Sequence, residues 1–247
     1  MVLIPFLLCW GSFLNVLSHR LIRGVDIVFQ RSRCPLCQKN ISWFDLIPVF
    51  SWLLLQGKCR QCRGAISALY PFIEILTPLI MIPLILWTPL RYIPAYFLFF
   101  SALIVTIRSD IEHLLISRFV TLFLIPVGLL LSSVNALPIT FLDSLIGALL
   151  GYGFLLAIAS LFRWITKKDG MGQGDLELLA FIGSFTGIIG CWMSLLIGSI
   201  LGTLYGLLCT PLSKKTSVKI PFGPFLSFGA ISYVLWQQSI LNALFGF

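Results

Sequence analysis

The chain has 247 residues, of which 58% are hydrophobic and only 11% charged, and its formal net charge is +8. A soluble domain contains about 25% charged and about 45–50% apolar residues, so this composition excludes a secreted domain, a cytosolic enzyme and a disordered chain. Lipid must solvate most of the chain, and the fold class that we predict is an all-α, polytopic membrane protein.

Eight apolar segments are candidates to cross a bilayer as helices, which takes about 17–25 residues. In chain order the predicted spans are 2–18, 69–89, 92–109, 115–133, 142–163, 177–190, 191–211 and 223–245. Two arrangements are open for 177–211: one long span with a re-entrant piece, or two shorter helices. Gly183, Gly187 and Gly190 favour a tight break between two helices.

The basic residues predict the orientation of these spans. If the first span runs from outside to inside, 16 of the 17 basic residues lie inside and only Arg91 lies outside. Basic residues collect in cytoplasmic loops, so we predict an external N-terminus and a cytoplasmic loop over 19–68. The net charge then reflects topology, and we expect no nucleic-acid partner.

The cytoplasmic loop 19–68 contains two CxxC motifs, separated by 21 residues: Cys34 with Cys37, and Cys59 with Cys62. This spacing is typical of a zinc-ribbon-like site with four thiolates. The alternatives are disulfides or unpartnered thiols, but lasting disulfides are rare in a reducing compartment. We therefore predict a structural zinc ion that folds the loop. The other three cysteines lie singly in apolar segments and are predicted packing residues: Cys9, Cys191 and Cys209.

Acidic residues number only nine, so each position is informative. Asp26, Asp45, Asp143 and Asp169 fall in or near polar loops and are predicted to be solvated. Glu74 lies inside the second span, where an ionisable group is usually functional or paired. The other four form two clusters at cytoplasmic ends of predicted spans: Asp110 with Glu112, and Asp175 with Glu177.

Two carboxylates at one membrane depth can share a proton, so that one activates a water and the other protonates a substrate carbonyl. The segment Gly170-Met171-Gly172-Gln173-Gly174-Asp175 favours Asp175 over Glu177, because Gly172 and Gly174 leave room for an extended peptide to approach. The alternative is that these acids are interfacial groups paired with Arg108, Arg118 or Lys168.

Five motifs follow one another along nearly the whole chain. They are Gly11-Ser12-Phe13-Leu14-Asn15-Val16, the segment from Cys34-Pro35-Leu36-Cys37 to Cys62, Tyr70-Pro71 with Glu74, Gly172-Gln173-Gly174-Asp175, and Ile220-Pro221-Phe222-Gly223-Pro224-Phe225. This ordered set resembles the type IV prepilin peptidases, a GxGD aspartic protease family of bifunctional leader peptidases and N-methyltransferases.

The resemblance implies that Asp110 and Asp175 are catalytic and remove leaders from type IV prepilins and type II secretion pseudopilins. It places the enzyme in the bacterial inner membrane. The basic loop also suits contact with anionic lipid headgroups, which makes membrane lipid a further predicted partner. The resemblance also implies that S-adenosylmethionine methylates the new N-terminus. Residues 1–90, with the first two spans and the loop, would be associated with methyl transfer, and Glu74 is the candidate residue there; 91–247 would form the peptidase domain. Two alternatives stay open: a GxGD protease without methyl transfer, and a non-enzymatic, zinc-stabilised membrane scaffold.

Three positions depart from the family pattern. Leu115-Ile116-Ser117-Arg118 stands where the family has a Pro followed by Asp or Asn, and Arg108-Ser109 stands where an apolar pair precedes the first aspartate. Glu177 replaces a Lys two residues after the GxGD motif. We expect Arg108 or Arg118 to supply the compensating positive charge.

Overall fold

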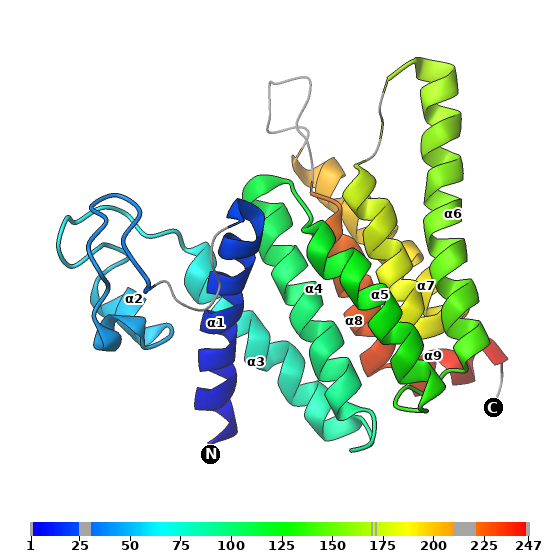
Figure 1. Cartoon of the computed structure of the whole chain (residues 1–247), viewed down its shortest axis with the longest axis horizontal. Coiled ribbons are helices and arrows are strands. Elements are labelled where there is room, and N and C mark those ends of the chain that lie inside the picture. The colour runs from blue at the N-terminus through cyan, green and yellow to red at the C-terminus, as the bar shows by residue number, and fades with distance from the viewer. Residues whose placement is uncertain (1, 25–30, 169, 171, 210–220, 246–247) are drawn as a thin grey trace. The chain divides into compact units, whose positions relative to one another are not determined.

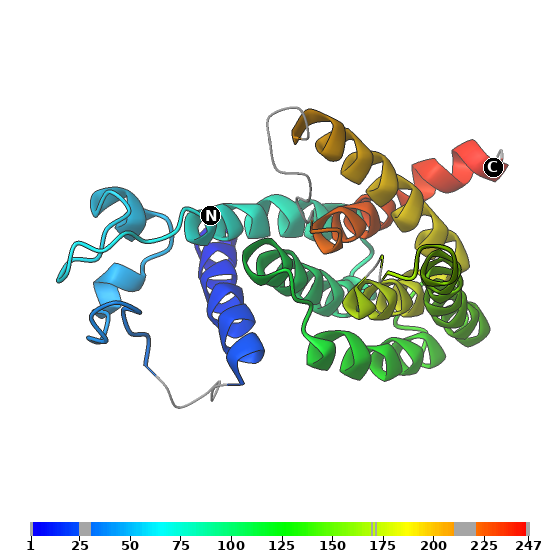
Figure 2. The same ribbon diagram turned by 90° about the horizontal axis from the view of Figure 1, so that it is seen from above.

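The computed structural model describes residues 2–24, 31–168, 170, 172–209 and 221–245 (Figures 1 and 2). Its helices are α1 (Leu3–Arg23), the short 3-10 helix η1 (Trp43–Leu46), α2 (Phe50–Leu54), α3 (Leu69–Trp87), α4 (Ile93–His113), α5 (Arg118–Ser133), α6 (Phe141–Thr166), α7 (Gln173–Cys209), α8 (Gly223–Leu235) and α9 (Gln237–Phe245). Apart from two isolated β-bridges, these residues contain no β-structure, so the predicted all-α class is confirmed for them. Some residues named above lie outside the described part: Asp26, Asp169, Met171 and Ile220.

Two compact units divide the chain, Met1–Pro83 and Leu84–Phe247. In the first unit, polar groups join α1 to α3. Asn15 is buried on α1 and donates a side-chain hydrogen bond of 3.1 Å to the carbonyl of Tyr70. The four-cysteine segment, with η1 and α2, connects these two helices.

Helix α4 is the core of the second unit, and its residues are buried almost continuously from Ala95 to Asp110. Aromatic rings join it to α7: the centroid of Phe99 lies 4.9 Å from that of Phe185 and 5.2 Å from that of Phe181. Helix α5, the first half of α7 and α8 surround α4 (Figure 2). Helix α4 ends at the same end of this unit at which α5, α7 and α8 begin (Figure 1).

Helix α7 changes direction at Gly187, whose backbone has φ 70° and ψ −169°. A residue with a Cβ rarely adopts this positive φ, so glycine suits the break. The carboxylate of Asp143, in the first turn of α6, accepts a hydrogen bond of 3.1 Å from the backbone N–H of Ile188. The predicted break within 177–211 is confirmed, and the two halves run in different directions (Figure 1).

Four of the described helices are long and apolar enough to cross a membrane: α3, α4, α6 and α7. Helices α5 and α8 are apolar but contain only 16 and 13 residues. The predicted span 223–245 is divided, because the backbone of Trp236 leaves the helical region between α8 and α9. The predicted count of eight spans is therefore not confirmed by the described helices.

Candidate active site

Asp110 lies in the last turn of α4 and is only 5% exposed. Its carboxylate accepts a hydrogen bond of 2.9 Å from the backbone N–H of Gly223, the first residue of α8. A Cβ at position 223 would lie 2.8 Å from Oδ2 of Asp110, closer than such atoms normally approach. Glycine at this position thus allows the start of α8 to bind the carboxylate directly.

Asp175 lies in the first turn of α7, because this helix begins at Gln173, four residues before the predicted span. Its backbone N–H donates a hydrogen bond of 3.2 Å to the carbonyl of Gly172. The side chain is half-buried, and its carboxyl group is close enough to that of Asp110 to interact electrostatically. The fold thus brings together two aspartates that are 65 residues apart in the sequence.

The glycines before Asp175 lie next to the aspartate pair. A Cβ on Gly174 would lie 2.9 Å from Cβ of Ile116, and one on Gly172 would lie 3.4 Å from a carboxylate oxygen of Asp175. Ile116 also faces Gly223, where a Cβ would lie 3.2 Å from its Cδ1. Gly174 and Gly223 therefore both pack against Ile116 beside the aspartate pair, whereas Gly172 has only the Asp175 carboxylate near it.

Glu177 is not a member of the aspartate pair. It is 2% exposed, and its Oε1 forms an ion pair of 3.0 Å with Nε of Arg118, at the start of α5. The hydroxyl of Thr121 donates a further hydrogen bond of 3.3 Å to Oε2. Arg108 instead pairs with Glu112 on its own helix. Of the two arginines expected to compensate the charge of Glu177, Arg118 does so directly.

The four cysteines of the first unit form a separate cluster. The sulfur atoms of Cys34, Cys37, Cys59 and Cys62 all lie within 4.8 Å of one another, which suits one metal ion. Both motifs have the same local geometry: the N–H of the residue after the second cysteine donates to the carbonyl of the first. These two residues, Gln38 and Arg63, both have φ 58°. The two motifs thus form turns of the same geometry, and each turn directs its two thiols toward the centre of the cluster.

The electrostatics of this cluster also favour a cation. Backbone N–H groups of Cys62 and Gln61 lower the pKa of the Cys59 thiol to about 7, which favours the thiolate that binds metals. A backbone hydrogen bond from Gly64 lowers the pKa of Cys62, but desolvation and the neighbouring thiols outweigh it and raise the pKa to about 11. Four thiolates repel one another, and a bound cation offsets that repulsion.

Two family models match the chain in succession. Residues 6–88 match the bacterial peptidase A24 N-terminal domain, and residues 97–207 match the type IV leader peptidase family. The chain belongs to the type IV leader peptidase family. This confirms the resemblance inferred from the five sequence motifs.

Relatives of similar length support this membership. A prepilin leader peptidase/N-methyltransferase of Aeromonas salmonicida (strain A449) is 34% identical over 95% of this chain and 90% of its own length. A type 4 prepilin-like proteins leader peptide-processing enzyme of Escherichia coli O78:H11 is 33% identical, over 92% and 90%. No solved structure gives a significant match.

In this leader peptidase, some residues of the candidate site could not be recognised from the sequence. Gly223 belongs to the motif Ile220-Pro221-Phe222-Gly223-Pro224-Phe225, but the motif alone indicates no partner for its backbone N–H. Ile116 lies in the segment Leu115-Ile116-Ser117-Arg118 and Thr121 in the segment after it, but neither side chain by itself indicates a contact with the site. For Gly223, the available signal was a glycine followed by Pro224 at the start of an apolar helix, where a free backbone N–H faces outward.

Glu74, the candidate for methyl transfer, lies in the first unit of the leader peptidase and is 6% exposed. Its Oε2 accepts a hydrogen bond of 2.7 Å from the backbone N–H of Val49, and its carboxylate also bonds the Ser12 side chain. Glu74 thus fastens α3 to both α1 and the four-cysteine segment. It lies in a different unit from the aspartate pair.

Proposed function

We propose that this protein removes the leader peptides of prepilins at the cytoplasmic face of the bacterial inner membrane and then methylates the new N-terminal residue. The observation that carries this proposal is the Asp110 and Asp175 pair, which lies at one end of the helices in the segment that matches the leader peptidase family. Family membership supplies the substrate class, including the pseudopilins of type II secretion.

The aspartate pair supports hydrolysis without a covalent intermediate. One carboxylate takes a proton from a water molecule as the water oxygen attacks the scissile carbonyl carbon. The other carboxyl group donates its proton to the carbonyl oxygen, and the leaving amine is protonated when the C–N bond breaks. The Gly223 N–H fixes the position of Asp110 throughout, and the two groups titrate as one unit.

The substrate reaches this pair along the glycines at the start of α7. A type IV prepilin presents an apolar helix in the bilayer and a polar leader in the cytoplasm. Gly172 is exposed and has no side chain that would keep an extended backbone from Asp175, and Gly174 lets the start of α7 pack against Ile116. The excess of basic residues on one predicted side supports an external N-terminus and eight crossings, with α7 contributing two of them. Membrane lipid would surround these crossings.

The first 90 residues would serve methyl transfer, and 91–247 would form the peptidase domain. Cys34, Cys37, Cys59 and Cys62 would hold a structural zinc ion, since four thiolates leave no open coordination position. S-adenosylmethionine would supply the methyl group. Glu74 would position the groups around it, because it bonds both α1 and the segment after the first CxxC motif.

The test is processing of a prepilin in membranes that contain the wild-type protein, Asp110→Asn or Asp175→Asn. We expect either variant to insert normally but to lose leader removal by at least about 10³-fold, because each removes one half of the acid–base pair. Asp45→Asn is the matched control, since Asp45 is paired with Arg60 outside this site.

The mass of the processed pilin then shows whether one methyl group has been added. Normal cleavage by either catalytic-site variant would contradict the peptidase assignment. Cleavage without methylation by the wild-type protein would instead identify a GxGD protease that lacks methyl transfer.

A further inference from the structure

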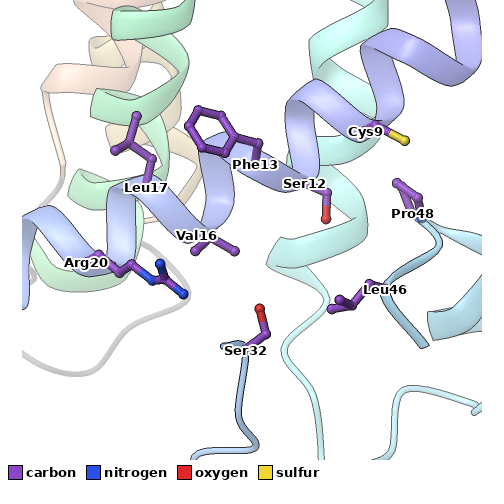
Figure 3. Close-up of a pocket in the computed structure, with 9 residues that line it drawn as sticks. All are labelled: Cys9, Ser12, Phe13, Val16, Leu17, Arg20, Ser32, Leu46 and Pro48. Carbon is purple, nitrogen blue, oxygen red and sulfur yellow. The ribbon is translucent and has the colours of Figure 1, made fainter. Parts of the chain in front are cut away.

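A pocket of about 310 Å³ lies within the first unit, between α1 and the segment 32–48 (Figure 3). One face of α1 lines it with residues that include Ser12, Phe13, Val16 and Arg20, which follow the helical repeat. Ser32, Leu46 and Pro48 close the opposite side. The volume is at the lower end of the range of about 300–1,000 Å³ that small-molecule sites occupy.

The lining of this pocket combines one cation with hydroxyl groups and apolar walls. Arg20 extends toward the space in front of Ser32, and the hydroxyls of Ser12 and Ser32 point toward the gap between α1 and the loop (Figure 3). Phe13, Val16 and Leu46 supply the apolar surface. Such a lining suits a ligand that has a carboxylate at one end, hydroxyls in the middle and a flat apolar group.

Hydrogen bonds to Glu74 hold two parts of the pocket wall, Ser12 on α1 and the backbone next to Pro48. Ser12 bonds the buried carboxylate of Glu74, which also accepts the Val49 N–H at 2.7 Å. Val49 has φ 63° and ψ −52°, a backbone conformation that a β-branched residue rarely adopts. It directly follows Pro48, which lines the pocket. The hydrogen bond to Glu74 thus holds Val49 in a strained backbone conformation, and such strained residues are common next to binding sites.

We propose that this pocket binds the methyl donor, S-adenosylmethionine, with Arg20 holding its carboxylate. The proposal rests on the methyl-transfer half of the proposed function. The donor has the required carboxylate, ribose hydroxyls and planar adenine. The other candidate occupant is the N-terminal residue of the processed pilin. That residue offers an ammonium group but no carboxylate for Arg20 to bind, whereas the methyl donor carries both a carboxylate and an ammonium group.

The experiment measures binding directly, with the full-length protein in detergent and radiolabelled S-adenosylmethionine. We expect Arg20→Ala to weaken binding about 10- to 100-fold, as loss of one charge-assisted hydrogen-bond partner does. Val16→Trp should abolish binding by filling the pocket. The matched control is Arg23→Ala, which removes a basic residue from the same helix but outside the pocket lining.

Two further readouts keep the result unambiguous. Prepilin cleavage by the same preparations should stay within about twofold of wild type, which shows that the variants fold. Ultraviolet crosslinking of the bound donor should label peptides from 9–20 or 32–48. Wild-type affinity in both Arg20→Ala and Val16→Trp, or crosslinks elsewhere in the chain, would overturn the site while the methyl-transfer function stands. A wild-type protein that binds no donor would overturn both.

Discussion

The ion pair between Arg118 and Glu177 makes a quantitative prediction about the peptidase site. Glu177 is 2% exposed and two residues from Asp175, whereas the Arg118 side chain is 63% exposed. Breaking a fully buried pair costs about 3–5 kcal/mol, and an exposed pair contributes about 0–1 kcal/mol. Because one partner is buried and the other exposed, we take about 2 kcal/mol for losing this pair, which corresponds to a change of about 30-fold in an equilibrium or rate constant. Arg118→Ala should therefore reduce the rate of leader cleavage about 10- to 30-fold, because the start of α7 loses its attachment to α5.

The assay is the initial rate of prepilin processing in membranes at saturating substrate. Glu177→Gln should cost only about threefold, because the amide has no charge to compensate and can still accept from Thr121. Arg118→Glu should be the most damaging single change, with two carboxylates facing each other. The double variant Arg118→Glu with Glu177→Arg should recover to within about fivefold of wild type. Lys168→Ala removes an exposed cation and serves as the control.

Two outcomes would refute this reasoning about the ion pair. A wild-type rate in Arg118→Ala would mean that the pair does not position Asp175. A charge-swapped protein no better than Arg118→Glu would mean that the contact itself is not what matters. A change in KM with kcat unchanged would assign the pair to substrate binding instead.

Three other perturbations test separate parts of the structure. Gly223→Ala places a Cβ 2.8 Å from Oδ2 of Asp110, so leader cleavage should fall at least about tenfold while the protein still inserts; an unchanged rate would contradict the contact. Gly187→Ala forces a side chain onto a φ of 70° and should destabilise the protein by about 1–2 kcal/mol, seen as a lower Tm in detergent. Cys59→Ser should lower the zinc content measured by elemental analysis and increase protease cleavage within 31–68, whereas a retained metal would contradict the four-thiolate site.

Much of the candidate site could be predicted because its signals are local in the sequence. The spacing of the two CxxC motifs predicts that four thiols lie together, and in the fold their sulfur atoms lie within 4.8 Å of one another. The glycines of 177–211 indicated a break, which occurs at Gly187. The two aspartates were predicted to meet because both lie at predicted cytoplasmic ends of spans, which limits how far apart they can be.

Contacts between distant segments could not be predicted in the same way. Gly223 and Asp110 are 113 residues apart, and Arg118 and Glu177 are 59 apart. Which residues of two helix ends meet depends on helix rotation and on where each helix begins, and both are set by packing rather than by local pattern. The start of α7 at Gln173, before its apolar segment, shows the effect: it places Asp175 inside the first helical turn.

The positions of these helix starts also bear on Glu177, which stands where the resemblance predicts a lysine. Asp175 lies in the first turn of α7, and Asp110 accepts the N–H of the first residue of α8. A helix N-terminus carries a partial positive charge of roughly half an elementary charge. Two such termini therefore converge on the aspartate pair and supply main-chain positive charge to the one carboxylate that must ionise. With Glu177 neutralised by Arg118, the proposed acid–base pair needs no additional lysine to sustain that charge.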